Sequence, residues 1–140
     1  MYDKILLPTD GSEGAETAFK HARELAGKYD ADLHILYVAD VRIESVSDFV
    51  SNLSGALEKA GREATEDLAE KAAERGVNTV PVVRKGIPHS EINEYVNENS
   101  IDMVVMGTHG RTGIDRMLIG STTEKVVRTS EVPVLTVGRD

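Results

Sequence analysis

Met103-Val104-Val105-Met106-Gly107-Thr108-His109-Gly110 is an apolar run that leads directly into a glycine-rich turn. Nine residues later, Gly120-Ser121 opens a segment with helical spacing. A strand that passes through such a loop into a helix can hold phosphate, because loop amides and the positive end of the helix dipole converge there. The same pattern also fits a plain strand-to-helix connection in which Ser121 is an N-cap and no ligand binds.

The rest of the chain alternates between expected strands and expected helices. Apolar runs predict strands at 4–7, 33–38, 77–83, 101–106 and 132–137, and helical periodicity predicts helices at 13–29, 49–75, from 88 onward and at 121–130. Ser12 is the expected N-cap of the first helix, and Gly76 is expected to end the second. Gly55 and Gly61 weaken the first half of that second helix, which we expect to be mobile or partly non-helical.

Nearly continuous, β-branched strands that alternate with helices predict a parallel sheet covered on both faces. The expected fold is α/β, a single domain over residues 1–140 with a doubly wound, five-stranded parallel sheet. Pro81 is tolerable only near a sheet edge or an irregularity, and Pro133 is compatible with an edge position for the last strand. An uncovered edge invites pairing with a second copy of the chain.

Composition narrows the classes of function. The formal net charge of −8 argues against general nucleic-acid binding, which needs a basic surface. No stretch approaches the roughly 20 apolar residues that span a bilayer, and the first residues lack the zones of a signal peptide. We therefore expect a cytoplasmic protein without a membrane anchor. The absence of cysteine excludes disulfides, thiolate metal sites and thiol catalysis.

Two loops are expected at the edge of the sheet where ligands bind in doubly wound folds, beyond the carboxyl ends of the strands at the point where the winding reverses. One is Pro8-Thr9-Asp10-Gly11-Ser12 and the other is the glycine motif. If their strands are neighbours, Asp10 faces the glycine motif. Asp10 could then bind a ribose hydroxyl or help to hold a divalent metal. It could equally be a turn residue ahead of the Ser12 cap.

The glycine motif does not match the two commonest nucleotide patterns. A P-loop is absent because Ser121 follows Gly120 with no lysine between them, and G-x-G-x-x-G is absent as well. The remaining pattern, G-x-x-G, nine residues and G-S, resembles the nucleotide-binding signature of the universal stress protein family, in its ATP-binding branch. The resemblance covers the whole chain through these stretches, in the right order: Ile5 to Ser12, Tyr37-Val38, Val104 to Gly110, Gly120-Ser121-Thr122 and Val132 to Val137.

The resemblance implies a Rossmann-like, adenine nucleotide alpha hydrolase-like fold that binds ATP together with Mg²⁺ or Mn²⁺. Carried over by position, Asp10 contacts the ribose and the backbone around Val38 recognises the adenine edge. The other implied binding residues lie at the strand ends and in the motif: Pro8, Thr9, Met106, Gly107, His109, Gly110, Gly120, Ser121 and Thr122. We expect the hydroxyl of Thr123 to add a further donor at the helix start.

Family resemblance also implies a homodimer through the last strand and a nucleotide-dependent stress or signalling role with an unknown protein partner. Two other classes remain open. A slow metal-dependent ATPase or phosphotransferase could use Asp10, although no water-positioning residue is identifiable. A nucleotide-free dimeric scaffold would use the fold alone. The intact glycines argue against that scaffold.

Overall fold

The computed structural model describes residues 1–42, 50–108 and 120–138. Its helices and strands alternate as the sequence predicts, with small differences at their ends. In chain order they are β1 (Lys4–Thr9), α1 (Glu13–Tyr29), β2 (Asp32–Asp40), α2 (Val50–Ala73), β3 (Thr79–Gly86), α3 (Pro88–Glu98), β4 (Met103–Gly107), α4 (Ser121–Thr129) and β5 (Val134–Val137). The third strand starts later than expected, because Val77 N donates to Ala72 O of α2 at 3.2 Å. It also runs further than expected, since its pairing with β2 continues to Gly86, opposite Asp40.

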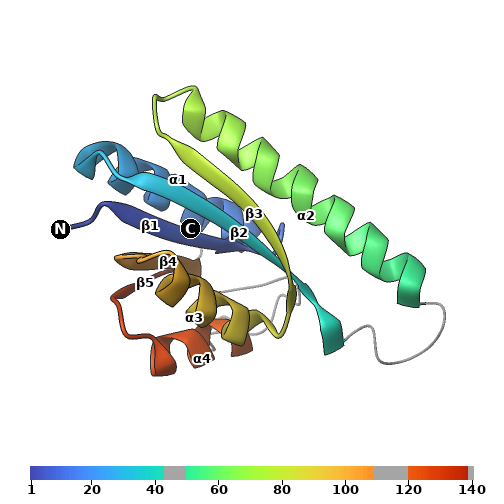
Figure 1. The fold of residues 1–140 in the computed structure, drawn as a ribbon. Coiled ribbons are helices and arrows are strands. Elements are labelled where there is room, and N and C mark those ends of the chain that lie inside the picture. The colour runs from blue at the N-terminus through green and yellow to red at the C-terminus, as the bar shows by residue number, and fades with distance from the viewer. Residues whose placement is uncertain (43–49, 109–119, 139–140) are drawn as a thin grey trace.

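The strands form one parallel sheet in the order β3-β2-β1-β4-β5 (Figure 1). The chain winds outward from β1 to β3 and then returns to the other side of β1, so the winding reverses between β1 and β4. The expected α/β class, a five-stranded doubly wound Rossmann-like sheet, is therefore confirmed. The neighbouring position of β1 and β4, on which the expected site depended, is confirmed as well.

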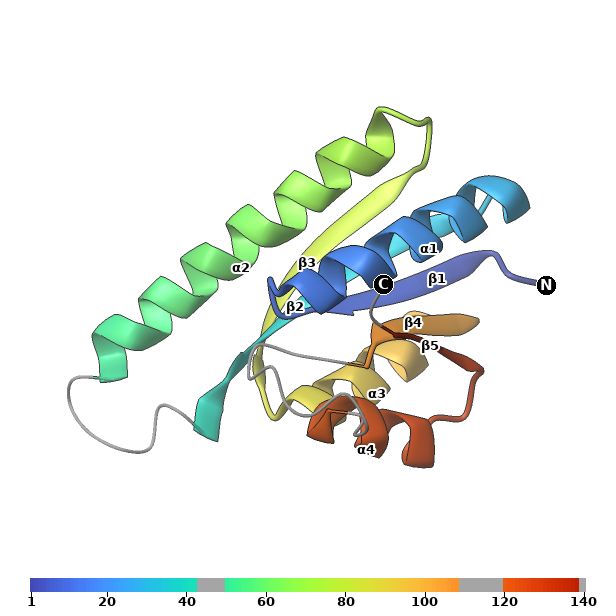
Figure 2. The same ribbon diagram turned by 180° about the vertical axis from the view of Figure 1, so that it is seen from behind.

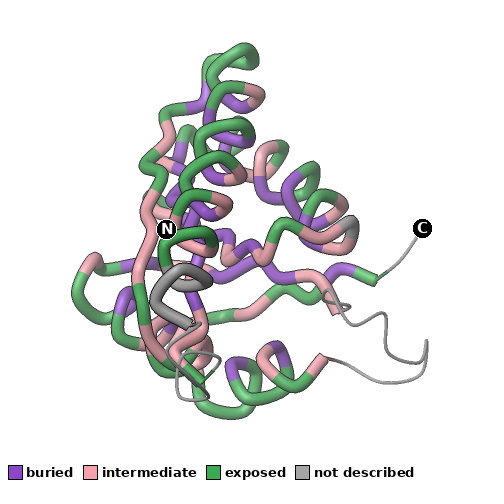
Figure 3. The backbone as a smooth tube through the Cα atoms, turned by 90° about the vertical axis from the view of Figure 1, so that its right-hand side faces the viewer, coloured by how far each residue is buried: buried purple, intermediate pink, exposed green. Residues whose placement is uncertain are grey.

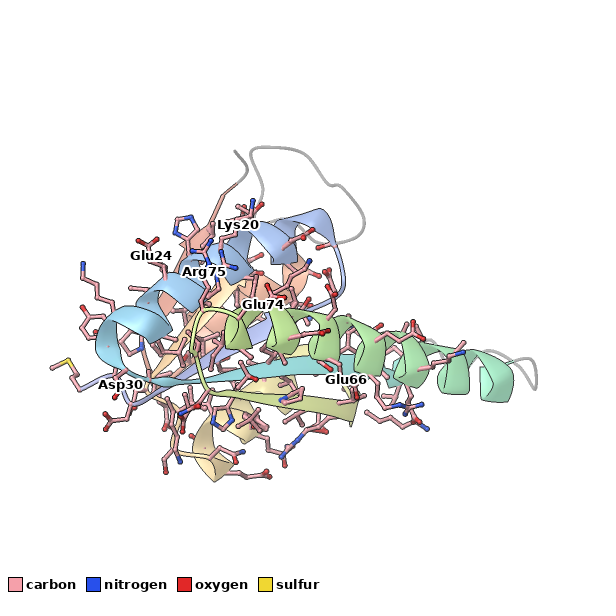
Figure 4. All side chains as sticks on the ribbon, turned by 90° about the horizontal axis from the view of Figure 1, so that it is seen from above. Lys20, Glu24, Asp30, Glu66, Glu74 and Arg75 are labelled. Carbon is pink, nitrogen blue, oxygen red and sulfur yellow. The ribbon has the colours of Figure 1, made fainter. Side chains whose placement is uncertain are left out.

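Two helical layers cover the sheet, with α1 and α2 on one face and α3 and α4 on the other (Figures 1 and 2). Alternation along β1 explains this: Ile5 and Leu7 pack under α1 and α2, while Leu6 between them packs with α3 and α4. The buried residues concentrate where sheet and helices meet (Figure 3). Seen from above, α1 carries exposed charged side chains such as Lys20 and Glu24, and the exposed Glu66 of α2 lies toward β3 (Figure 4).

The second helix is continuous across both of its glycines, so the expectation of a partly non-helical first half is wrong. Gly61 lies against the ring of Tyr37 on β2, and a Cβ added there would be 2.4 Å from Tyr37 Cδ1. A glycine is needed at this point because the helix approaches the aromatic ring too closely for any side chain. Gly76 has a φ of +75° just beyond the helix, which confirms its expected role in ending it.

The two edges of the sheet differ in their free hydrogen-bonding groups. Asn78 O accepts a bond from Leu33 N at 2.8 Å. Because both backbone groups of a residue in a parallel ladder point to the same neighbour, even-numbered residues of β3 bond to β2. The nitrogen of Pro81 therefore faces the open edge, where a missing donor costs nothing. This confirms the edge position expected for Pro81, and β5 forms the opposite edge as expected.

A buried polar pair joins β2 to α3. His34 Nδ1 lies 2.6 Å from the hydroxyl of Tyr95, and both residues are buried. The guanidinium of Arg84 on β3 lies 4.9 Å from the centre of the Tyr95 ring and pairs with Glu98 at 2.6 Å. Burial and the nearby charge of Lys4 lower the pKa of His34, partly opposed by Asp32. His34 is thus a structural residue of the α3 layer.

Candidate functional site

The ends of β1 and β4 lie side by side at the carboxyl edge of the sheet. The two strands pair in parallel register, with Leu6 opposite Val104, and their chains leave the sheet at Asp10 and Thr108 (Figure 2). On the other side of β1, Thr9 is opposite Tyr37, so Val38 lies one position beyond Thr9 on β2. The fold therefore brings the first expected loop next to the exit of β4, with Val38 one strand away.

The loop after β1 is organised by its own side chains. Thr9 Oγ1 accepts a hydrogen bond from Gly11 N at 3.1 Å, and Asp10 Oδ1 accepts one from Ser12 N at 2.9 Å. Gly11 has a φ of +79°, which favours glycine. Ser12 then caps α1, because its Oγ accepts a bond from Ala15 N at 3.3 Å, as expected. Asp10 thus forms the turn that the sequence left as one of its two roles, and it does so at the carboxyl edge.

The exit of β4 is packed against the start of α1. A Cβ added to Gly107 would be 2.7 Å from the carbonyl oxygen of Gly14, in the first turn of α1. The resemblance places Gly107 among the nucleotide-binding residues, and the structure shows that backbone packing alone already requires a glycine there. No sequence signal pointed to Gly14. The neighbouring Met106 is buried in the layer formed with α3 and α4.

The fourth helix begins beside this exit without a side chain to cap it. Gly120 is the N-cap, with φ −57° and ψ 150°, so Ser121 is the first helical residue rather than the cap. The first amides of a helix have no acceptor within it, and Ser121 is exposed while Thr122 is half-buried. Gly120 N donates to Thr108 O at 2.7 Å, which ties the start of α4 to the chain leaving β4.

Thr123 does not supply the exposed hydroxyl that we expected. It is buried, and its Oγ1 donates a hydrogen bond to Gly107 O at 2.9 Å. The reason is helical geometry: Thr123 follows Thr122 by about 100° around the axis, and that rotation turns it from the open side toward the sheet. The pattern Gly120-Ser121-Thr122-Thr123 thus contains two kinds of residue. Ser121 and Thr122 are accessible, and Thr123 is a contact to β4.

The remaining features of this edge are the rest of the glycine motif, the charged residues of α4 and the search for metal ligands. His109 and Gly110, two of the binding residues implied by the resemblance, lie outside the described residues. On α4, Lys125 is exposed and Arg128 pairs with Glu124 one turn before it. Within the described ranges, no group of three or more His, Asp or Glu side chains is placed to hold a metal ion. None of the helices there combines the length and hydropathy needed for a bilayer span.

The hydrogen-bonding groups at this edge are mostly neutral donors whose positions are fixed by the fold. The first turn of α4 offers backbone amides, the hydroxyls of Ser121 and Thr122, and the positive end of the helix dipole. Asp10 supplies a carboxylate in the loop after β1, the strand next to β4. Such a set suits a ligand that combines an anionic group with hydroxyl donors, since the amides favour the anion and the carboxylate favours the hydroxyls.

Comparison with known proteins gives a consistent result. The profile of the Universal stress protein family matches residues 1–138. The chain is 37% identical over 143 residues to Universal stress protein MJ0531 of Methanocaldococcus jannaschii, covering 98% of this chain and 82% of that protein. The structure of MJ0577 from the same organism superposes with a TM-score of 0.89 at 36% identity, covering 100% of this chain and 98% of the other.

Two more distant structures share the fold and carry nucleotides. One is a universal stress protein in complex with cAMP, with a TM-score of 0.75 at 24% identity over 97% of each chain. The other is a family protein from Arabidopsis thaliana with AMP bound, with a TM-score of 0.73 at 21% identity, covering 98% of this chain and 92% of the other. The family profile and the close relatives span nearly the whole sequence, and the chain therefore belongs to the universal stress protein family.

Proposed function

We propose that this chain is a single-domain, cytoplasmic protein that binds ATP at the carboxyl edge between β1 and β4 and uses it in a stress-response or signalling role. One observation carries the proposal. The start of α4 lies at the point where the winding of the sheet reverses, with a glycine as its cap and accessible residues in its first turn. That is where doubly wound folds bind anionic ligands.

The roles follow from the positions of the groups. Phosphates accept hydrogen bonds from the amides and hydroxyls of Ser121 and Thr122. They lie beside Gly120, whose own amide donates to Thr108 O. Asp10 accepts bonds from the ribose hydroxyls. The backbone near Val38 contacts the adenine, and His109 and Gly110 complete the phosphate loop. The complexes of two relatives with cAMP and AMP support the choice of an adenine nucleotide. Mg²⁺ or Mn²⁺ would bind together with the phosphates. Such an ion needs few ligands from the protein, because phosphate oxygens and water supply most of its coordination.

We expect the site to hold its nucleotide rather than to cleave it efficiently. Hydrolysis needs a group that orients or deprotonates the attacking water. In the part of the chain that the structure describes, Asp10 is the acidic residue at the end of β1, and its Oδ1 is already engaged by Ser12 N. A weak ATPase is the alternative, and phosphate release above that of a binding-deficient variant would demonstrate it.

Binding is tested by calorimetry with ATP and GTP in the presence of Mg²⁺, together with melting curves. ATP at about 100 times its Kd stabilises the folded state by about 2.7 kcal/mol. Gly120→Val should abolish this effect without unfolding the protein, since φ −57° and ψ 150° suit any L residue. Gly55→Ala is the control, because nothing lies within 4 Å of its added Cβ and it lies on α2, outside the residues proposed to bind ATP. An unchanged melting curve of the wild type with millimolar ATP refutes the proposal.

We propose further that two copies associate through β5. Val104 N donates to Pro133 O and Thr108 N donates to Val137 O, both at 2.9 Å, so the odd-numbered residues bond to β4. The backbone groups of Val134 and Thr136 consequently face the open edge. The N–H groups of Val134 and Thr136 can donate hydrogen bonds at this open edge, whereas Pro81 at the opposite edge has no N–H group. Leu135 adds an apolar side chain that is 39% exposed.

This assembly is tested by light scattering after size-exclusion chromatography. Thr136→Pro removes one outward donor and should convert a dimer to a monomer. Thr136→Val keeps that donor and serves as the control. A wild-type protein that is monomeric at high micromolar concentration contradicts the proposed dimer, while leaving nucleotide binding untouched.

A further inference from the structure

Thr123 stands apart from the other hydroxyl residues at the start of α4. It is 6% exposed, and its side chain is directed to the sheet instead of to solvent. Its Oγ1 donates to Gly107 O at 2.9 Å, across sixteen positions of sequence. This bond joins the first turn of α4 to the last residue of β4.

The hydrogen bonds around it form a short chain between the helix start and the sheet. Gly120 N donates to Thr108 O at 2.7 Å, and Thr108 N donates to Val137 O at 2.9 Å. The first of these bonds fixes the residue before the helix but does not reach the first turn itself. The bond from Thr123 is the second point of attachment. Further along α4, Val126 is buried in the core and Thr129 Oγ1 accepts a bond from Asn93 Nδ2. At the start of the helix, the attachments at Gly120 and at Thr123 hold the direction in which the first-turn amides point.

The cap of α4 leaves its first turn without a side-chain attachment from the capping residue. In α1 the side chain of Ser12 holds the first turn through Ala15 N. In α4 the cap is Gly120, which has no side chain to do the same. A capping side chain would occupy the amides that an anion needs. Thr123 instead orders the helix start from the side facing the sheet and leaves those amides open.

We propose that Thr123 is a positioning residue for the nucleotide: its hydroxyl bond to β4 holds the first turn of α4 in the orientation that binds phosphate. The inference rests on the proposed ATP binding at this edge. A helix start without this bond samples other orientations, so part of the binding free energy is spent on ordering it. Removing the bond therefore lowers the affinity for ATP, although Thr123 itself does not contact the phosphates.

Three variants separate positioning from general stability. Thr123→Val keeps the size of the side chain and removes the hydroxyl, whereas Thr123→Ser keeps the hydroxyl and removes a methyl group. Thr65→Val is the matched control, because Thr65 is also buried and its Oγ1 also donates to a carbonyl, Gly61 O, at 2.9 Å. Thr65 lies on α2, in the helical layer on the opposite face of the sheet from α4.

Calorimetry with ATP and Mg²⁺ should show about tenfold weaker binding for Thr123→Val, the effect of one lost hydrogen bond. Thr123→Ser should bind within about twofold of the wild type even though its melting temperature falls, since it loses packing but not the bond. Thr65→Val should lose stability and keep its affinity. Equal affinities of Thr123→Val and the wild type overturn the inference, and so does a Thr123→Ser variant that binds as weakly as Thr123→Val.

A measurement without ligand keeps the inference testable if the protein proves not to bind ATP. Amide hydrogen exchange at Gly120 and Glu124, whose N–H groups donate to Thr108 O and Gly120 O, should be faster in Thr123→Val than in the wild type, and unchanged in Thr65→Val. If the wild type does not bind ATP, the proposed function is refuted. If exchange is nevertheless faster in Thr123→Val than in the wild type, the positioning of α4 by Thr123 still holds. Exchange that is the same in Thr123→Val and the wild type refutes the positioning role itself.

Discussion

Two glycines in the same helix should respond in opposite directions to the same substitution. Replacing a glycine by alanine within a helix stabilises it by about 0.5–1 kcal/mol through propensity. At Gly55 an added Cβ meets nothing within 4 Å, so Gly55→Ala should stabilise the protein by about that amount. At Gly61 the added Cβ would be 2.4 Å from Cδ1, 2.8 Å from Cγ and 2.9 Å from Cε1 of Tyr37.

The contact at Gly61 outweighs the gain in propensity. Tyr37 is 4% exposed, so its ring cannot move aside into solvent, and the helix or the strand must shift instead. Overpacking of this kind costs about 1–3 kcal/mol. The net effect of Gly61→Ala is therefore a loss of up to about 2 kcal/mol, in place of the gain seen at Gly55.

Urea denaturation followed by far-UV circular dichroism measures both variants. The midpoint should rise for Gly55→Ala and fall for Gly61→Ala, with m-values like that of the wild type. A double-mutant cycle with Tyr37→Leu should show favourable coupling, because the smaller side chain relieves the contact. Stabilisation by Gly61→Ala in the wild-type background would refute the reasoning.

Three further predictions address the site, the buried histidine and the open edge. Gly107→Ala should destabilise the protein by about 1–3 kcal/mol in the same urea assay, because the new Cβ meets a backbone oxygen of Gly14 at 2.7 Å; a neutral result contradicts the packing argument. Burial and Lys4 lower the pKa of His34, so the unfolded chain binds the proton more readily, and stability should fall as the pH drops below the ordinary histidine pKa of 6.5. Above pH 6.5 the contribution of His34 to the free energy of unfolding is complete. His34→Gln should therefore flatten the dependence of stability on pH below 6.5, and an unchanged dependence would show that other groups cause it. Pro81→Thr restores an outward donor on β3 and should produce additional, concentration-dependent association in light scattering, whereas an unchanged mass would mean that Pro81 does not protect this edge.

Much of the architecture could be predicted because it follows from local chemistry. Apolar runs such as Met103 to Met106 and the helical spacing of Ile92, Tyr95 and Val96 are periodic over short distances, and the structure confirms both. The edge position of Pro81 was predictable for a similar reason, since a residue without a donor is excluded from a central strand. Proximity of β1 and β4 was only conditional, because strand order is a property of the whole sheet.

The errors have one common cause, which is that they concern contacts between segments distant in sequence. Gly61 was interpreted as a weak point of its helix, but the structure pairs it with Tyr37 on another element. Thr123 was grouped with Ser121 and Thr122, and its hydroxyl bonds to β4. In each case the residue type was informative and its partner could not be deduced.

The sequence by itself determined the class of fold, the order of its elements and the family, because periodicity and the glycine motif are properties of short stretches and of their spacing. Only the tertiary structure decided which residues of that motif face outward and which hold the motif in place. The physical reason is that a side chain's role depends on what the fold places against it. At the start of α4 a rotation of about 100° per residue separates the accessible Thr122 from the buried Thr123.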